Sequence, residues 1–306
     1  PPRRRSADPT LARAPGRAEP PPPDLLRGPD APVRFGTSSF SSKDWVGPFY
    51  PLGTPPAAFL AHYARTFDTV EVDSTYYRIP GARTVDGWGA KTPETFLLSA
   101  KFPREIVHAG GGRVPDGRTI LDPDSTYEAR DRFLEVMARL GPRLGPLVLQ
   151  FPYFNREIFP SAGPFLDRLD RFLADLPREM FRYGVEVRNR AWMAKPLRDL
   201  LAKHDVTLVL VDQAWMPHAD EVEKRFDPVT SGLVYVRLLG DRKKIEQLTT
   251  TWGEEVLDQG PRLERWASFL VRTMDRGVRA LVYANNHYAG HGPATVRRLM
   301  DLFERA

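Results

Sequence analysis

Two charged residues interrupt an otherwise apolar stretch at residues 183–189, YGVEVRN. Side chains alternate along a β-strand, so Glu186 and Arg188 share one face while Val185 and Val187 share the other. If that charged face is buried, its members must pair or hydrogen-bond, because an isolated buried charge is very costly. A carboxylate there can transfer protons, and an arginine can bind a carboxylate or phosphate through two parallel hydrogen bonds.

Candidate acid/base groups occur at comparable positions in other β-rich stretches. Three of them are carboxylates, and the fourth is a lysine that becomes a base if burial lowers its pKa. An acid/base hydrolase, lyase or isomerase would use such groups. The predicted catalytic residues are Glu71, Lys101, Glu186 and Asp212.

Lys101, Arg188 and Arg237 are predicted to converge on one site. Three cations together would bind a small anion such as a phosphate or a carboxylate. The sequence therefore predicts an anionic, phosphorylated or sugar-like ligand. An alternative stays open, in which Glu71 and Glu186 pair with the two arginines as an ionic plug that satisfies itself.

Short β-rich stretches recur from residue 33 onward, and amphipathic patterns with apolar residues at i, i+3, i+4 and i+7 separate most of them. Such alternation indicates parallel β/α units, and eight units close a single TIM-type (β/α)₈ barrel. The predicted strands are residues 33–39, 68–75, 95–102, 145–152, 183–189, 206–212, 233–240 and 279–286. The predicted helices are residues 55–67, 125–140, 163–177, 195–204, 261–277 and 292–306.

Two connections carry only weak helical signals. Residues 76–94 hold at most a short helix around 86–90, and residues 213–232 show little periodicity. An open doubly wound sheet is the alternative, but its strands would be apolar on both faces. Five strands here carry polar residues at alternate positions, and no Gly-x-Gly-x-x-Gly or Walker-type loop follows any strand. The pattern favours a closed barrel with polar layers inside.

Polar residues concentrate near the C-terminal ends of the predicted strands, where barrel enzymes build their active sites. Some face inward by alternation, and others end a strand. They are Glu71, Asp73, Thr75, Lys101, Gln150, Glu186, Arg188, Asp212, Tyr235, Arg237 and Asn285. His287 follows in the loop after the last strand and is a further candidate ligand-binding residue. It is the single imidazole near the carboxylates, and adjacent cations would oppose a divalent ion, so we expect no metal and no other cofactor.

The composition is that of a globular protein with a basic charge balance. The chain has 306 residues, a net charge of +5 and no cysteine, which excludes disulfides and thiolate chemistry and fits a cytoplasmic location. The charge invites a nucleic-acid partner, but acids and bases are interspersed (39 against 44), so that partner is not favoured. No apolar run approaches the roughly 20 residues that span a bilayer, so we expect no membrane partner. The oligomeric state stays open.

Residues 1–32 differ from the rest of the chain. They hold 10 of the 30 prolines and several arginines, with few large apolar side chains. Such a segment buries too little surface to offset its ordering entropy. We therefore predict a disordered Pro/Arg-rich tail at 1–32 and a barrel domain at 33–306.

Motifs spread over residues 33–300 together resemble those of the YecE-like family, also called the domain of unknown function 72 family. They are GTSSFSSKDWVGPFYP, FDTVEVDSTYYRIP, FLLSAKFPREIVH, LGPLVLQFP, VEVRNRAW, YVRLLG and YANNHYAG. The resemblance implies a TIM-type barrel but no defined reaction. It also implies a site that includes Tyr77, Trp192 and Asn286, besides Glu71, Thr75, Lys101, Gln150, Glu186, Arg188, Tyr235, Arg237 and Asn285.

The chain departs from the family pattern at several positions. The second strand motif usually has Asn and Phe, where this chain has Asp73 and Tyr76. The seventh strand usually ends in a His before the Gly, where this chain has Leu239. If that His has a catalytic role, this member is altered in activity or only binds. A non-catalytic nucleic-acid or protein-binding module is therefore the alternative to an enzyme.

Overall fold

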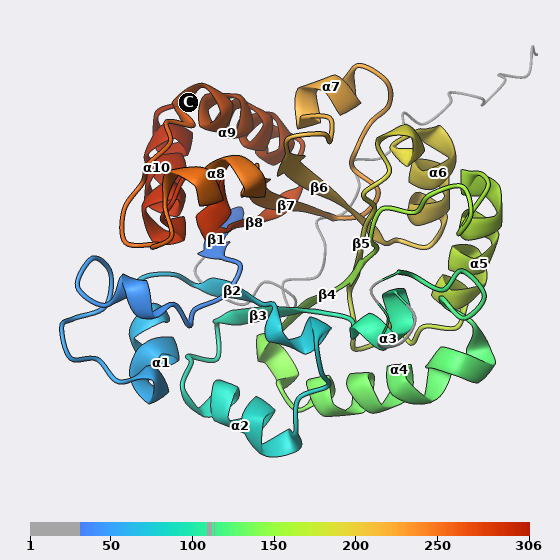
Figure 1. Ribbon diagram of the computed structural model, residues 1–306, viewed down its shortest axis with the longest axis horizontal. Coiled ribbons are helices and arrows are strands. Elements are labelled where there is room, and N and C mark those ends of the chain that lie inside the picture. The colour runs from blue at the N-terminus through green and yellow to red at the C-terminus, as the bar shows by residue number, and fades with distance from the viewer. Residues whose placement is uncertain (1–30, 109–111, 113) are drawn as a thin grey trace, which may run out of the picture.

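The computed structural model describes residues 31–108, 112 and 114–306, and its centre is a sheet of eight parallel strands (Figure 1). The strands neighbour one another in the order β1-β8-β7-β6-β5-β4-β3-β2, and a bridge between Ser38 and Glu71 joins the two ends of this order. The sheet thus closes into a barrel, which confirms the (β/α)₈ prediction. The strands are β1 Val33–Thr37, β2 Thr69–Val72, β3 Leu97–Lys101, β4 Leu144–Gln150, β5 Tyr183–Glu186, β6 Thr207–Gln213, β7 Leu233–Gly240 and β8 Arg279–Ala284.

Helices surround the barrel on its outside (Figure 1). All six predicted helices are present, and the two weak connections hold only the short helices α2 and α7. Two further short helices, α3 and α8, have no counterpart in the sequence prediction. The helices are α1 Phe59–Tyr63, α2 Ala82–Ala90, α3 Arg104–Val107, α4 Pro123–Ala138, α5 Ala162–Ala174, α6 Lys195–Lys203, α7 Ala219–Glu223, α8 Arg242–Leu248, α9 Gly260–Asp275 and α10 Gly292–Arg305. Short 3₁₀ turns include η4 Ser74–Tyr76, η6 Arg190–Trp192 and η7 Asn286–Tyr288.

The alternation of side chains sorts each strand into an outer and an inner face. Outward residues such as Val70, Val185 and Val236 pack in the main core under the helices. Inward residues form a separate apolar layer inside the barrel. That layer contains Leu97, Val148, Val209, Val211, Tyr235, Leu281 and Tyr283. The charged residues of the candidate site therefore share the interior of the barrel with this apolar layer.

A glycine in β1 permits the closure of the barrel. A Cβ built on Gly36 would lie 2.1 Å from the carbonyl oxygen of Thr69 in β2. Any larger residue would push these two strands apart, because real Cβ atoms do not approach an oxygen so closely. The same contact brings β1 next to Thr69, the first residue of β2, which is the strand that carries Glu71.

The predicted tail lies almost wholly outside the described residues, which begin at Ala31. Pro32 already belongs to the barrel, since its carbonyl accepts a hydrogen bond from the Ala280 amide at 2.9 Å. Within the described part of the chain, none of the helices combines the length and the apolar character needed to cross a membrane.

Candidate functional site

Glu71, in β2, is the centre of an ionic cluster inside the barrel. We define this cluster as Glu71, Lys101, Glu186, Arg188 and Arg237. Glu71 is fully buried and accepts hydrogen bonds from the Tyr235 hydroxyl at 2.7 Å and from Arg237. Burial alone would raise the pKa of Glu71, but Arg237 and then Lys101 outweigh that effect and lower it to about 2. The carboxylate therefore stays ionised at neutral pH.

Arg237, in β7, connects the two buried carboxylates. Its Nε and Nη2 donate to Glu71 at 3.2 and 2.9 Å. Its Nη1 donates to Gln150 Oε1 at 2.8 Å and to Glu186 Oε2. Burial disfavours the charged guanidinium, but Glu186 and Glu71 outweigh this and raise the pKa of Arg237. Every nitrogen of Arg237 is engaged within the barrel, as the ionic-plug alternative requires.

Arg188 lies just beyond the end of β5 and is held by two of its three nitrogens. Its Nε donates to Glu186 Oε1, and its Nη1 donates to Gln213 Oε1. Its Nη2 makes no hydrogen bond to any residue that the structure describes, and the side chain is 15% exposed. Arg188 is thus oriented by its neighbours and keeps one donor group without a partner among the described residues.

Lys101 ends β3 and is the least satisfied cation of the cluster. Its side chain is only 10% exposed, and its Nζ lies 3.7 Å from Glu71 Oε1, beyond ordinary hydrogen-bond distance. Over the described ranges, Nζ has no hydrogen-bond partner. Burial, followed by the nearby charge of Arg237, lowers the pKa of Lys101, and Glu71 opposes that shift.

Asp73 follows β2 and is half-buried beside Lys101. Burial raises the pKa of Asp73, and the charge of Lys101 opposes the shift. The Asp73 side chain forms no ion pair or hydrogen bond with any other residue in the described part of the chain. It is a second group near Lys101 with unused capacity to exchange protons.

Asp212 lies outside the barrel, so the prediction that it belongs to the mouth is wrong. It is 1% exposed and accepts hydrogen bonds from Arg262 and Trp266 of α9, and from the Tyr288 hydroxyl at 2.7 Å. The physical reason is the alternation in β6. Val209 and Val211 face inward, so Asp212 faces outward and binds β6 to α9.

Gln213, the next residue, faces inward and accepts a hydrogen bond from Arg188. It is not among the site residues predicted from the sequence. The register between β6 and β7 shifts at this point, with Asp212 opposite Leu238 and Gln213 opposite Gly240. Counting alternate positions from the apolar run of β6 would have identified Gln213.

Thr75 and Tyr77 follow β2 but differ in their surroundings. Thr75 is buried, donates to the Lys101 carbonyl at 2.8 Å and accepts from the Lys101 amide at 3.0 Å, so it fixes the backbone of β3. Tyr77 is 79% exposed. Its neighbour Tyr76 is half-buried, and burial raises the pKa of the Tyr76 hydroxyl.

The residues after β8 form a hydrogen-bonded turn beside the end of β7, where the Asn285 amide donates to the Leu238 carbonyl at 2.9 Å. Asn285 Oδ1 accepts hydrogen bonds from the His287 amide at 3.0 Å and is 2.7 Å from its Nδ1. Asn286 Oδ1 accepts from Trp45 Nε1 and from the Gly292 amide. His287 Nε2 lies 3.3 Å from Glu246. The described contacts of these three residues hold the turn together, and none of these contacts involves the ionic cluster.

Trp192 and Leu239 are placed by apolar packing. Trp192 stacks on Phe165 with ring centroids 5.0 Å apart and also contacts Phe154. Leu239 is half-buried and packs against the apolar layer inside the barrel. Leu239 therefore faces inward, two residues beyond Arg237.

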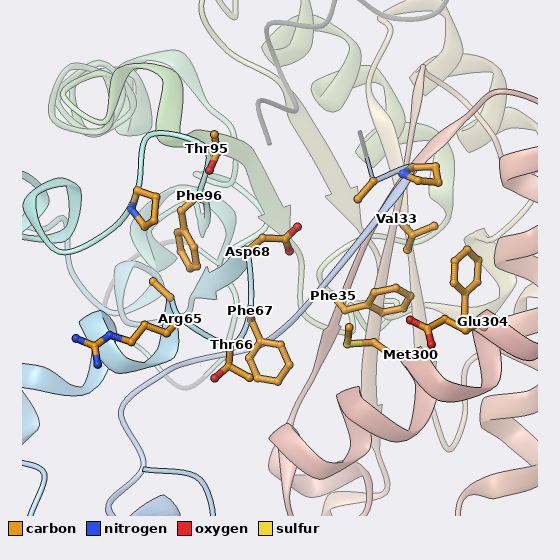
Figure 2. Close-up of a pocket in the computed structure, with 15 residues that line it drawn as sticks. Val33, Phe35, Arg65, Thr66, Phe67, Asp68, Thr95, Phe96, Met300 and Glu304 are labelled. Carbon is orange, nitrogen blue, oxygen red and sulfur yellow. The ribbon is translucent and has the colours of Figure 1, made fainter. Parts of the chain in front are cut away.

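A pocket of about 450 Å³ lies at the opposite, N-terminal end of the barrel (Figure 2). Figure 2 shows the apolar side chains of Phe35, Phe67, Phe96 and Met300 around it, with Asp68 at its edge. None of its lining residues belongs to the ionic cluster. This pocket is separate from the candidate site.

The candidate site has two parts: side chains whose hydrogen-bonding groups are occupied by one another, and side chains that keep donors or acceptors without a partner among the described residues. Glu71, Glu186 and Arg237 satisfy one another, whereas Lys101, Arg188 and Asp73 keep unused donors or acceptors. In the ranges that the structure describes, no three His, Asp or Glu side chains gather as a metal ion would require. The arrangement can bind an anion and transfer protons next to it.

Comparisons with known proteins agree with this fold. The model of the family "Protein of unknown function DUF72" matches residues 34–306. The UPF0759 protein YecE of Escherichia coli (strain K12) is 32% identical over 200 residues, which are 62% of this chain and 64% of that protein. The UPF0759 protein YunF of Bacillus subtilis (strain 168) is 28% identical over 167 residues, 54% of this chain and 53% of that protein. The match thus spans less than two thirds of the length of either relative.

Two solved structures share the fold. A DUF72 family protein from Thermotoga maritima superposes with a TM-score of 0.65 at 24% identity, over 89% of this chain and 99% of that chain. One from Enterococcus faecalis gives a TM-score of 0.61 at 21% identity, over 89% and 95% of the two chains. Since the family model covers the whole barrel, the chain belongs to the DUF72 family of proteins of unknown function.

Proposed function

We propose that this protein is an enzyme that binds a small anionic substrate at the C-terminal mouth of the barrel and transforms it by proton transfer. The observation that carries the proposal is the division of the ionic cluster. Each nitrogen of Arg237 donates to a partner inside the barrel, whereas Arg188, fixed by Glu186 and Gln213, keeps Nη2 unused.

Arg188 is the residue proposed to bind the anion. Two of its nitrogens are already held, so little conformational entropy is lost when the third meets a ligand. The 15% exposure of its side chain leaves access from the mouth while most of the side chain is removed from water. A phosphate or carboxylate is the matching ligand, because its oxygens accept charge-assisted hydrogen bonds from a guanidinium.

Lys101 and Asp73 are the groups proposed to move protons. Their environments shift the two pKa values toward each other, since that of Lys101 is lowered and that of Asp73 is raised. Groups whose pKa values move toward the working pH are suited to acid/base catalysis. Glu71 and Glu186 are proposed to hold the cations in place, because both oxygens of each carboxylate already accept hydrogen bonds from Arg188, Arg237 or Tyr235.

The test uses a panel of phosphorylated sugars incubated with the protein in deuterated water, followed by NMR. We expect at least one compound to show conversion or exchange of a carbon-bound hydrogen. Lys101→Met should abolish that change, while Lys91→Met, at an exposed lysine, should leave it intact. Anion binding that depends on Arg188 without conversion of any compound would instead favour the non-catalytic binding module.

A further inference from the structure

We propose that Lys101 is a nucleophile that forms a covalent imine with a carbonyl substrate. This inference rests on the proposed function and deepens it, because it names the class of substrate: an aldehyde or ketone that also carries a phosphate or carboxylate group. The residues that carry it are Lys101 as the amine, Arg188 as the anion holder and Asp73 as the proton donor.

The position of the Lys101 amine fits this role. It is 10% exposed, its nearest carboxylate oxygen is 3.7 Å away, and within the described residues it donates no hydrogen bond. A lysine whose task is to neutralise Glu71 would be expected at hydrogen-bond distance. The hydroxyl of Tyr235 and two nitrogens of Arg237 already fill that role.

The electrostatics of the site favour the neutral amine, which is the reactive form. Desolvation and the adjacent cation Arg237 both lower the pKa of Lys101. Lysines that react with carbonyl groups are activated by these same two effects. The hydrogen bonds between Thr75 and the Lys101 backbone keep the amine at a fixed place on β3.

The reaction balances with groups that are present. The amine nitrogen attacks the carbonyl carbon, and the resulting carbinolamine loses its hydroxyl as water when an acid supplies a proton, which leaves a protonated imine. Asp73 is suited to supply this proton, because burial raises its pKa and because Lys101 lies near enough to affect it. No oxidant, reductant or metal is required for these steps.

The test traps the imine by reduction. The full chain is incubated with dihydroxyacetone phosphate and sodium cyanoborohydride, which adds hydride to the imine carbon and makes the link permanent. We expect an intact mass gain of one substrate minus oxygen, and peptide mapping that assigns it to Lys101. The chain has eight lysines, so mapping on the unaltered protein decides the question even if a variant fails to fold.

Two variants and one further compound separate the inference from the proposed function. Lys101→Arg keeps the charge but should lose the label, whereas Lys91→Met should keep it. Uncharged dihydroxyacetone, and Arg188→Met with the phosphate compound, should label Lys101 about ten- to a hundredfold more slowly. If the protein still binds phosphate but Lys101 carries no label, the proposal that Lys101 forms an imine is overturned. If Lys101 is labelled at the same rate without the phosphate group and in Arg188→Met, the imine is supported and the role of Arg188 as anion holder is overturned.

Discussion

Arg237 donates two hydrogen bonds to Glu71, from Nε at 3.2 Å and from Nη2 at 2.9 Å, inside a barrel where both side chains are almost completely buried. The same guanidinium also reaches Glu186 on β5. One cation from β7 thus joins carboxylates from β2 and β5 across the interior. This cross-link fixes the position of Glu186, which in turn accepts a hydrogen bond from Arg188 nearer the mouth.

Replacing Glu186 with Gln should destabilise the protein. Glu186 accepts hydrogen bonds from both Arg188 and Arg237, and its loss leaves the buried Arg237 and the partly buried Arg188 each short of a partner. Breaking a buried ion pair in this way costs about 3–5 kcal/mol of unfolding free energy. Urea denaturation of Glu186→Gln and of the exposed control Glu94→Gln measures the difference. Equal midpoints for the two variants would contradict the role assigned to Glu186.

The stabilising contribution of Glu71 should disappear in acid. Its pKa falls from 4.5 to about 2 in the folded protein because Arg237 and Lys101 outweigh the effect of burial. A carboxylate with a lowered pKa stabilises the fold above its unfolded pKa and loses this effect as the pH falls toward the folded value. The difference in unfolding free energy between the unaltered protein and Glu71→Gln should therefore shrink between pH 4.5 and about 2. A difference that stays constant over this range would exclude an ionised Glu71.

Variants at Asp212 and Gln213 should have different effects on the stability of the protein and on its affinity for phosphate. Asp212 joins β6 to α9 outside the barrel, so Asp212→Asn should lower the melting temperature and leave phosphate affinity unchanged. Gln213 orients Arg188, so Gln213→Leu should weaken phosphate binding with a smaller loss of stability. Thermal melts and phosphate titrations of both variants supply the comparison. The reverse pattern would mean that the two residues have been assigned to the wrong faces of β6.

The sequence predicted the fold and the inner members of the site because both depend on simple periodicities. Alternation along β5 and β7 was enough to place Glu186 and Arg237 inside the barrel. Alternation along β6 also places Asp212 outward, next to the inward Val211, whereas its position at a strand end wrongly suggests the mouth. Contacts between distant segments could not be deduced from any local pattern.

The turn after β8 shows the same limit. Asn285 is predicted to bind a ligand because it is polar and ends a strand, and Asn286 because the family resemblance implies it. In the folded protein their carbonyl oxygens accept hydrogen bonds from His287, Trp45 and Gly292. Trp45 precedes Asn286 by 241 residues, and no spacing rule connects them. The sequence pattern indicates which end of the barrel carries the polar residues, but tertiary contacts decide which of these residues already have hydrogen-bond partners.

Titration of the protein with inorganic phosphate by calorimetry measures whether Arg188 binds an anion. The unaltered protein should bind phosphate, and Arg188→Met should weaken binding about ten- to a hundredfold, because a charge-assisted hydrogen bond is lost. Arg190→Met is the matched control, since Arg190 lies in the same loop but is half-exposed and pairs with Glu221. It should bind phosphate as the unaltered protein does. Phosphate binding that is equal in all three proteins, or absent from the unaltered one, would show that Arg188 is not an anion-binding residue.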